Sequence, residues 1–171
     1  MSLAGRAGRS ALLALLAAFA GGAPLIGADG QSGLDELPRE RIVLETRANG
    51  RHEYRAWRAD TPETRGRGLM YVAALADDQA MIFVYEQPQV VSMWMKNTYI
   101  PLDMLFVDAR GCIVSIAERT RPLSLASIES ASPVVLVVEI KGGELAARGA
   151  KAGDRVLRPD AASPPDARGG C

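Results

Sequence analysis

The chain has 171 residues, with 20 basic and 20 acidic side chains, one histidine and two cysteines. This balance lacks the electrostatic footprint of a nucleic-acid-binding protein, and two cysteines are too few for a disulfide framework. With His52 as the single histidine, no metal-type ligand spacing and no Gly-rich nucleotide loop, we expect no metal ion, no cofactor and no His-based catalytic triad.

Residues 1–28 have the pattern of a secretory signal peptide. Two arginines precede an apolar run at 11–20, small residues follow it, and cleavage after Ala20 or near Ala28 fits the pattern. The run is shorter than the roughly 20 residues of a membrane span, so we expect no stable membrane anchor, with an uncleaved anchor as the alternative. The pattern predicts an exported protein, either periplasmic or secreted.

The rest of the chain has the size of one domain. Residues 29–40 are polar and predict a flexible lead-in, residues 41–158 predict a single β domain, and the Pro-, Gly- and Ala-rich stretch at 159–171 predicts a disordered tail. No internal repeat is visible, and nothing in the sequence favours a particular oligomer.

The domain is predicted to open with a β-hairpin of residues 41–47 and 52–58. The strands flank Asn49-Gly50, a pair suited to the positive φ angles of a type I′ turn. A short helix should begin after Thr61, which can cap it, with Pro62 at the first helical position. Glycines follow soon after, so this helix should have only one or two turns.

Strand-length apolar runs fill the rest of the domain. The run at 134–140 is apolar on both alternating faces except for Glu139 and predicts a central strand, while 143–148 predicts a short helix that Gly149 ends. The remaining predicted strands are 80–85, 90–95, 102–107, 112–117 and 154–158. So many short strands predict a mostly β domain, a compact sandwich or barrel with one or two short helices, in preference to a sheet of βαβ units.

The two cysteines and two tryptophans have simple structural interpretations. Cys112 falls in a predicted strand and is expected to be a buried thiol, with Cys171 an exposed one; a bridge between them is the alternative in an oxidising compartment. Trp57 and Trp94 are expected in the core, with stacking on a sugar ring as the alternative.

The segment 94–98, with 100–103 after it, is the main candidate for a site. Its polar residues Lys96, Asn97 and Thr98 stand between two apolar strands, and Lys96 is one of three lysines in a chain that otherwise uses arginine. A lysine in this setting suggests a need for a compact ammonium group. The alternative is an ordinary turn in which Asn97 and Thr98 bond the local backbone and Lys96 is solvated.

Asp103 and Glu139 are acids within apolar strands. A buried carboxylate is costly unless it is paired or hydrogen-bonded, so each should meet a cation or several donors, with Arg65, Arg67 and Lys96 as the candidate cations. Acid–base chemistry and buried ion pairs that stabilise the fold are both compatible with this pattern.

Several motifs resemble one protein family, domain of unknown function 192. The strongest is Trp-Met-Lys-Asn-Thr at 94–98 with Ile-Pro-Leu-Asp at 100–103. Arg-Gly-Arg-Gly-Leu-Met at 65–70 is similar to a second family motif. The segments 80–83, 138–140 and 153–154 also resemble the family, so the resemblance runs from about residue 43 to 157. It implies a compact, mostly β fold, often behind a signal peptide, and no established activity.

Two departures limit what can be carried over from this family. Ala80 stands where the family usually has glycine, and residues 119–132 lack the cysteine found there in relatives, so no thiol chemistry is implied. The resemblance points to one cluster of ligand-binding residues: Arg65, Trp94, Lys96, Asn97, Thr98, Asp103 and Glu139.

The leading hypothesis is a non-catalytic binding or accessory module for a small polar or anionic ligand, such as a saccharide or peptide group, held near Arg65, Lys96 and Asn97. The first alternative is a hydrolase or lyase with Asp103 or Glu139 as the acid or base and Lys96 stabilising negative charge. The second is a scaffold whose function lies in a surface for a protein partner.

Overall fold

The computed structural model describes Met1, residues 33–161 and Cys171. Except for Met1, the predicted signal peptide at 1–28 lies outside the described residues, as do 29–32 of the predicted lead-in and 162–170 of the predicted tail. The domain begins before the expected boundary at residue 41, because Leu34 is buried and the first strand starts at Arg39.

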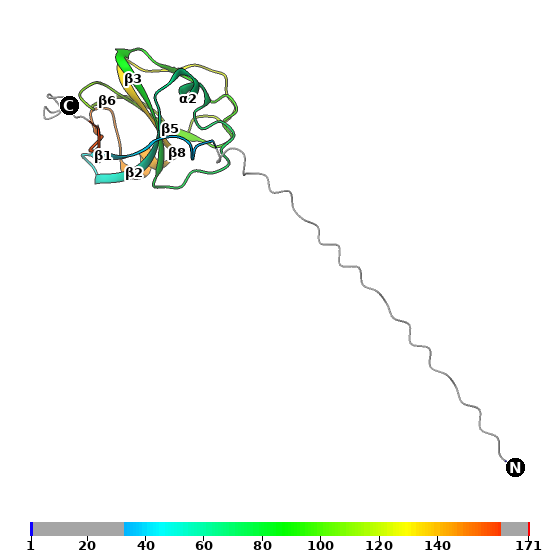
Figure 1. Cartoon of the computed structure of the whole chain (residues 1–171). Helices are drawn as coiled ribbons and strands as arrows, with labels where there is room; N and C mark the ends of the chain where they lie inside the picture. The colour runs from blue at the N-terminus through cyan, green and yellow to red at the C-terminus, as the bar shows by residue number, and fades with distance from the viewer. Residues whose placement is uncertain (2–32, 162–170) are drawn as a thin grey trace.

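Nine strands in the described residues form a seven-stranded sheet and a two-stranded sheet. The large sheet is strongly curled into a half-barrel, and its strand order is β6-β5-β8-β3-β2-β1-β9 (Figure 1). The predicted mostly β domain with two short helices is confirmed. The strands of the large sheet are β1 (Arg39–Thr46), β2 (Gly50–Ala59), β3 (Gln79–Gln89), β5 (Leu102–Val107), β6 (Ile113–Ala117), β8 (Val134–Lys141) and β9 (Arg155–Leu157). The small sheet pairs β4 (Ser92–Met93) with β7 (Ile128–Glu129), and the helices are α2 (Pro62–Arg67) and α3 (Glu144–Arg148).

The predicted first hairpin is present, but its turn differs from the expected type I′. β1 and β2 pair antiparallel from Arg39 opposite Trp57 to Thr46 opposite Gly50, so three residues connect the strands. Gly50 has a φ of 80°, whereas Asn49 does not have the positive φ that a type I′ turn requires. The Thr46 hydroxyl accepts a hydrogen bond from the Asn49 N–H at 3.0 Å, and this bond organises the longer connection.

One pair of strands in the large sheet is parallel. β2 and β3 run parallel, and the connection between them contains α2. A parallel pair needs a long crossover connection, which is why residues 60–78 cross one face of the sheet before the chain re-enters it. The many short strands and frequent turns of the sequence favour a sandwich or barrel over such a unit, and they do not reveal this one parallel pair.

The other predicted elements are largely confirmed. β8 is central, with β3 on one side and β5 on the other, and α3 ends at Gly149 with a φ of 63°. The prediction of a strand over 90–95 was too long, since only Ser92–Met93 forms a strand there. The rest of that run leaves the sheet and becomes part of the site described below.

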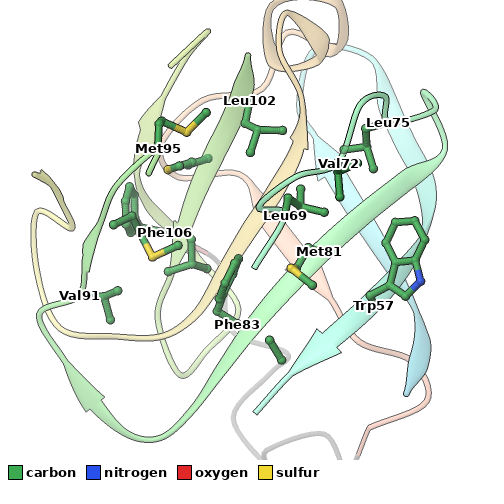
Figure 2. Close-up of a cluster of buried hydrophobic side chains, with 14 of the residues drawn as sticks. Trp57, Leu69, Val72, Leu75, Met81, Phe83, Val91, Met95, Leu102 and Phe106 are labelled. Atoms are coloured by element: carbon green, nitrogen blue, oxygen red, sulfur yellow. The ribbon is translucent and has the colours of Figure 1, made fainter. Parts of the chain in front are cut away.

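Two hydrophobic clusters occupy opposite faces of the large sheet. One of them includes Ile113 of β6 and Val156 of β9, which are the two edge strands, so it fills the inside of the curl. The other cluster is covered by loops and contains large flexible side chains such as Met81, Phe83 and Met95 (Figure 2). Trp57 is buried in this second cluster, as expected.

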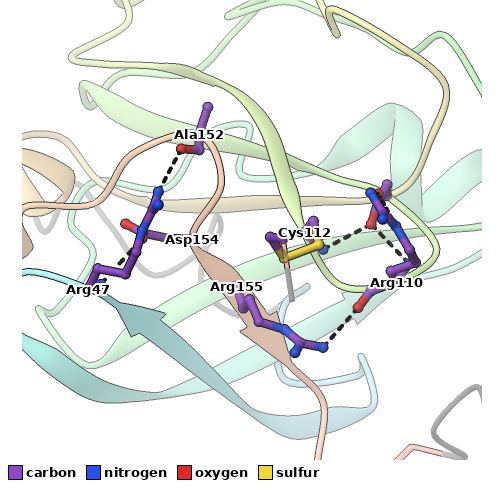
Figure 3. Close-up of a disulfide and its surroundings, with 8 residues drawn as sticks. Arg47, Arg110, Cys112, Ala152, Asp154 and Arg155 are labelled. Atoms are coloured by element: carbon purple, nitrogen blue, oxygen red, sulfur yellow. Dashed lines mark hydrogen bonds and ion pairs between the residues drawn. A yellow bond between two sulfur atoms is a disulfide. The ribbon is translucent and has the colours of Figure 1, made fainter. Parts of the chain in front are cut away.

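Cys112 and Cys171 form a disulfide with their Cα atoms 5.6 Å apart (Figure 3). The expected pair of free thiols was therefore wrong, although Cys112 is buried as predicted. The bridge is possible because Cys112 pairs with Arg155 of β9 across the gap between the sheet edges, which brings the end of the chain close to Cys112. A sequence separation of 59 residues hides this proximity from sequence analysis.

Candidate functional site

A pocket of about 220 Å³ opens on the sheet face that carries the loop-covered cluster. Its walls come from the end of α2, from β3 and β8, and from the segment 92–98. The lining includes Arg65, Arg67, Phe83, Tyr85, Trp94, Lys96, Thr98 and Glu139. Residues from 65 to 139 in the sequence therefore meet at one cavity.

Local sequence explains how α2 reaches the pocket. Thr61 and Thr64 form a capping box, in which the Thr61 hydroxyl accepts from the Thr64 N–H at 3.2 Å and the Thr64 hydroxyl accepts from the Thr61 N–H at 3.0 Å. Gly68 ends the helix with a φ of 49°, and a Cβ atom there would lie 3.1 Å from the ring of Phe83. A glycine is therefore needed for the chain to turn so close to the pocket wall.

Arg65 is held firmly at the pocket. Its Nη1 donates to the main-chain carbonyls of Asp60 at 2.6 Å and Val84 at 3.0 Å, and its guanidinium lies 4.9 Å from the centre of the Tyr85 ring. Burial raises the pKa of Tyr85, while the charge of Arg65 lowers it and that of Glu139 raises it. The three groups therefore interact electrostatically within one pocket.

The segment 94–98 presents alternate side chains to the pocket and to the core. Met95 is fully buried, whereas Trp94 is 49% exposed and Lys96 is exposed. The Lys96 ammonium lies 5.3 Å from the centre of the Trp94 ring, a cation–π contact. The expectation that Trp94 belongs to the core was wrong, because this part of the chain lies outside the large sheet and its alternation faces solvent.

Asn97 lies beside the pocket lining but is not part of it. Its φ of 54° is left-handed, and its Nδ2 donates to the Tyr71 hydroxyl at 2.8 Å. The Tyr71 N–H in turn donates to the Asn97 carbonyl at 2.9 Å, while the Thr98 hydroxyl donates to the Lys96 carbonyl at 3.2 Å. Asn97 and Thr98 thus make the local bonds of the turn interpretation, and they also set the direction of Lys96.

Glu139 lines the pocket, and its carboxyl group has no hydrogen bond or ion pair with any described residue. It is 4% exposed and lies between Met81 of β3 and Met104 of β5 in the sheet register. Because burial removes its carboxylate from water, the pKa of Glu139 is raised to about 8. Glu139 is therefore mainly protonated at neutral pH, and its expected cation or donors are absent from the described structure.

Asp103 lies on the opposite face of the sheet. Its neighbour Met104 is opposite Glu139 in the register, so strand alternation directs Asp103 away from the pocket. Its carboxylate accepts three main-chain N–H groups, from Arg119 at 2.6 Å, Gly143 at 2.9 Å and Leu145 at 2.8 Å. These bonds connect β5 to the start of α3 and satisfy the expectation of several donors.

The pocket has an uneven distribution of charge. Arg65, Arg67 and Lys96 form no ion pair with an acid anywhere in the described part of the chain, although many arginines outside the pocket do, such as Arg58 with Asp60 and Arg158 with Glu40. The one acid in the pocket lining, Glu139, is mainly neutral. The side chains that line the pocket therefore carry a net positive charge at neutral pH.

The structure brings together five of the seven predicted site residues. Arg65, Trp94, Lys96, Thr98 and Glu139 line the pocket, Asn97 lies next to it, and Asp103 is on the far face of the sheet. Tyr85 was missed, although the alternation of Met81, Phe83 and Tyr85 places all three on one face of a strand. Arg67 was considered as a partner for an acid and is instead an unpaired cation of the lining.

Other features of the described residues are weaker candidates for a functional site. A second cavity of about 490 Å³ borders Arg110, Leu157 and Ala161. Across residues 33–161, no group of three or more His, Cys, Asp or Glu side chains is arranged to hold a metal ion. No helix in the same residues is long and apolar enough to cross a membrane.

Comparisons with known proteins agree with the fold and the motifs. The family model DUF192, described as an uncharacterized ACR, matches residues 43–157, and no curated protein matches the chain. A solved structure from Sinorhizobium meliloti 1021, named a "putative transcription regulator", is 39% identical with a TM-score of 0.69, over 71% of this chain and 95% of that one. A protein of unknown function from Novosphingobium aromaticivorans DSM 12444 is 35% identical with a TM-score of 0.69, over 71% of this chain and 86% of that one. The chain belongs to the DUF192 family.

Proposed function

We propose that this domain is a binding module for a small anionic ligand, such as an acidic saccharide or a peptide group, and that the ligand occupies the pocket between α2 and the segment 94–98. One observation carries the proposal: Arg65, Arg67 and Lys96 line a single pocket, and none forms an ion pair with an acid of the described residues. Unpaired cations beside an apolar cavity favour an anion that brings its own negative charge.

The arrangement of the pocket suits recognition of an anion with a polar neutral group. Arg65 is held by two carbonyls and a ring, so little side-chain freedom is lost when a ligand binds to it. The protonated Glu139 in the lining can donate a hydrogen bond to an oxygen of the ligand. The regulator name of the Sinorhizobium protein is a weaker guide, because the balanced charge of this chain lacks the basic face that nucleic acid requires.

Ligand-dependent unfolding tests the proposal directly. The oxidised protein is unfolded by urea with acetate, N-acetylglycine, glucuronate or phosphate, and with glucose as a neutral control. A ligand that binds only the folded state adds about 2.7 kcal/mol of unfolding free energy at a hundredfold excess over its Kd. We expect a gain with at least one anion, none with glucose, and loss of the gain in Lys96→Ala.

The matched control is Lys151→Ala, which removes another exposed lysine that forms no ion pair in the described residues and is not part of the pocket lining. It should keep the full ligand response. Both variants should fold with near wild-type stability, because neither side chain is buried. An equal response in Lys96→Ala and in the wild type would contradict the proposal, as would no response to any anion.

Catalysis by Glu139 is a second candidate, and one observation favours it. A pKa near 8 in a pocket open to small molecules is suitable for a general acid or base near neutral pH. Asp103 is much less suited to this role, because three N–H groups occupy its carboxylate on the far face. If the domain is a hydrolase or lyase, Glu139→Gln should bind the anion found above yet turn over no ester, glycoside or phosphodiester that the wild type converts.

We also propose that the protein acts after export, in the periplasm or outside the cell. The disulfide between Cys112 and Cys171 supports this location, since such bonds persist in oxidising compartments. Cell fractionation checks it: the expected result is a shortened, oxidised protein outside the cytoplasm. A full-length, reduced protein in the cytoplasm would contradict it.

A further inference from the structure

Exposed apolar side chains lie on the segment 94–98 and on the loops that are bonded to it. Across residues 33–161, every large hydrophobic side chain that is exposed belongs to the stretch 71–125, and the most exposed, Leu125, is 70% accessible. Five of these side chains form what we call the aromatic platform: Tyr71, Trp94, Tyr99, Leu123 and Leu125. Concentrated exposed apolar surface of this kind marks an interaction site more often than chance exposure does.

Main-chain bonds join the platform into one surface. The Tyr71 and Tyr99 rings are 6.0 Å apart in an edge-to-face arrangement. The Leu123 N–H donates to the Thr98 carbonyl at 3.1 Å, and the Met95 N–H donates to the Ser124 carbonyl at 3.0 Å. The loops that carry the platform are therefore attached to the segment 94–98, and Trp94 belongs to both the platform and the pocket.

The backbone under the platform is strained. Tyr71, Asn97 and Leu123 have φ angles of 65°, 54° and 61°. Residues other than glycine adopt this left-handed backbone conformation much less often. Such conformations persist only where the surrounding structure enforces them, and they are common at ligand clamps. Here they direct two platform side chains outward, so the surface is preformed before any partner arrives.

We infer that the pocket and the aromatic platform together bind the free carboxyl-terminal end of a peptide, with the terminal carboxylate at Lys96 and Arg65 and the preceding apolar side chains on the platform. The inference rests on the proposed function, because it names the anion of the pocket. Charge complementarity carries it: unpaired cations lie at one end of an apolar surface, which matches a chain end with one negative charge and apolar residues before it.

The platform fits a peptide better than it fits a lipid bilayer. The Tyr71 hydroxyl is bonded by Asn97, and the Trp94 ring is covered on one side by the Lys96 ammonium. Rings that are anchored by polar neighbours provide rigid contact area for another chain. They are not free to enter the hydrocarbon of a membrane, so a membrane surface is an outcome of the test and not its expected result.

The experiment uses the oxidised protein and a positional-scanning library of N-acetyl tetrapeptides, each prepared as a free acid and as an amide. Binding is measured by affinity selection and then by calorimetry on the best sequences. We expect free acids to bind at least tenfold more tightly than the matching amides. Peptides with leucine or an aromatic residue near the end should bind at least tenfold more tightly than N-acetylglycine.

Variants separate the platform from the pocket. The double variant Leu123→Ser/Leu125→Ser should lose the gain of peptides over N-acetylglycine yet bind N-acetylglycine as the wild type does. Val90→Ser removes an exposed apolar side chain outside the platform, 59% accessible, and should change neither affinity. Lys96→Ala should weaken both ligands at least tenfold.

Three results would overturn the inference: amides that bind as tightly as acids, peptides that bind no better than N-acetylglycine, or binding to phosphatidylglycerol vesicles without binding to any peptide. If N-acetylglycine still binds in a Lys96-dependent manner, only the peptide inference fails and the anion pocket stands. If no small anion binds either, the proposed function fails with it.

Discussion

At the scale of single residues, Glu139 should make the stability of the domain depend on pH. Its pKa is raised from 4.5 to about 8 by burial, so between these values the unfolded chain loses a proton that the folded chain keeps. The free energy of unfolding should therefore fall as the pH rises, by about 1.4 kcal/mol per unit, and level off above about pH 8. Urea unfolding at pH 5, 6.5 and 8 measures this slope.

Glu139→Gln is the matched variant for this prediction, because it keeps the size of the side chain and removes the titration. Its unfolding free energy should be nearly constant from pH 5 to 8, and it should exceed the wild-type value at pH 8. Parallel pH profiles for the two proteins would show that Glu139 titrates normally and that its burial costs little.

Asp103 has the opposite character, because its carboxylate is satisfied by three main-chain donors. Asp103→Ala would leave the N–H groups of Arg119, Gly143 and Leu145 without this acceptor, at a cost of about 3 kcal/mol or more. We expect a large loss of stability in urea and, at low denaturant, unchanged anion affinity. A loss of affinity in a variant of wild-type stability would mean that Asp103 contributes to the site.

These two acids show how far single residues could be interpreted from sequence. Both were recognised as buried carboxylates that need an explanation, and both were placed in one cluster. Strand alternation separates them, since Asp103 lies next to Met104, which is opposite Glu139. That register depends on which strands are neighbours, and pairing between β5 and β8 cannot be deduced from local patterns.

At the scale of elements, the segment 94–98 depends on the left-handed backbone of Asn97. Asn97→Ala removes the bond to the Tyr71 hydroxyl and puts a residue poorly suited to this conformation at a φ of 54°. We expect a loss of about 1–2 kcal/mol in unfolding free energy. Chemical denaturation measures it, and Asn97→Gly should recover the part that is due to the backbone.

The two substitutions should differ in their effect on the site. In Asn97→Gly the backbone strain is relieved, but the hydrogen bond to the Tyr71 hydroxyl is lost, as it is in Asn97→Ala. Because Lys96 is then less well directed, anion affinity should fall in both variants. Equal stability of Asn97→Ala and the wild type would show that the turn is maintained by its other contacts, such as the Tyr71 N–H bond to the Asn97 carbonyl.

Sequence signals for elements were accurate where the chemistry is local. Thr61 and Pro62 indicated the start of α2, and Gly149 indicated the end of α3, because capping involves residues only a few positions apart. The segment 90–95 has the composition of a strand but leaves the large sheet after a two-residue strand. Its departure is decided by tertiary contacts, including the Met95 N–H bond to the Ser124 carbonyl.

At the scale of the whole molecule, the disulfide should stabilise the domain less than its sequence separation suggests. A loop of 59 residues closed in the unfolded chain corresponds to about 4 kcal/mol. In the folded protein, however, β9 already holds Leu157 near Cys112, so only the segment after Leu157 remains to be closed. The difference between the two loops leaves a net gain of about 1 kcal/mol.

Urea unfolding of the wild type and of Cys171→Ser checks this value. A loss near 1 kcal/mol is expected, with the pocket and its anion affinity unchanged, since the bridge is remote from α2 and from the segment 94–98. A loss near 4 kcal/mol would mean that β9 itself depends on the bridge for its place in the sheet.

The mostly β architecture followed from alternating short apolar runs, and it is confirmed. The curl of the sheet and the single parallel pair did not follow, because they depend on the order of strands. The order places β1 next to β9, and β8 between β5 and β3, and these neighbours are far apart along the chain. The pocket could not be predicted from the sequence for the same reason, because the strand order brings its walls together.

The pairing of β1 with β9 has a consequence for the timing of synthesis. Val43 lies opposite Leu157, so the ribosome adds the partner of the first strand 114 residues after Val43. At about 5–20 residues per second this interval is roughly 6 to 23 s. Meanwhile one edge of the nascent hairpin is open to other chains, and charged residues such as Arg39, Glu40 and Arg41 along that strand discourage wrong pairing until the last strand emerges.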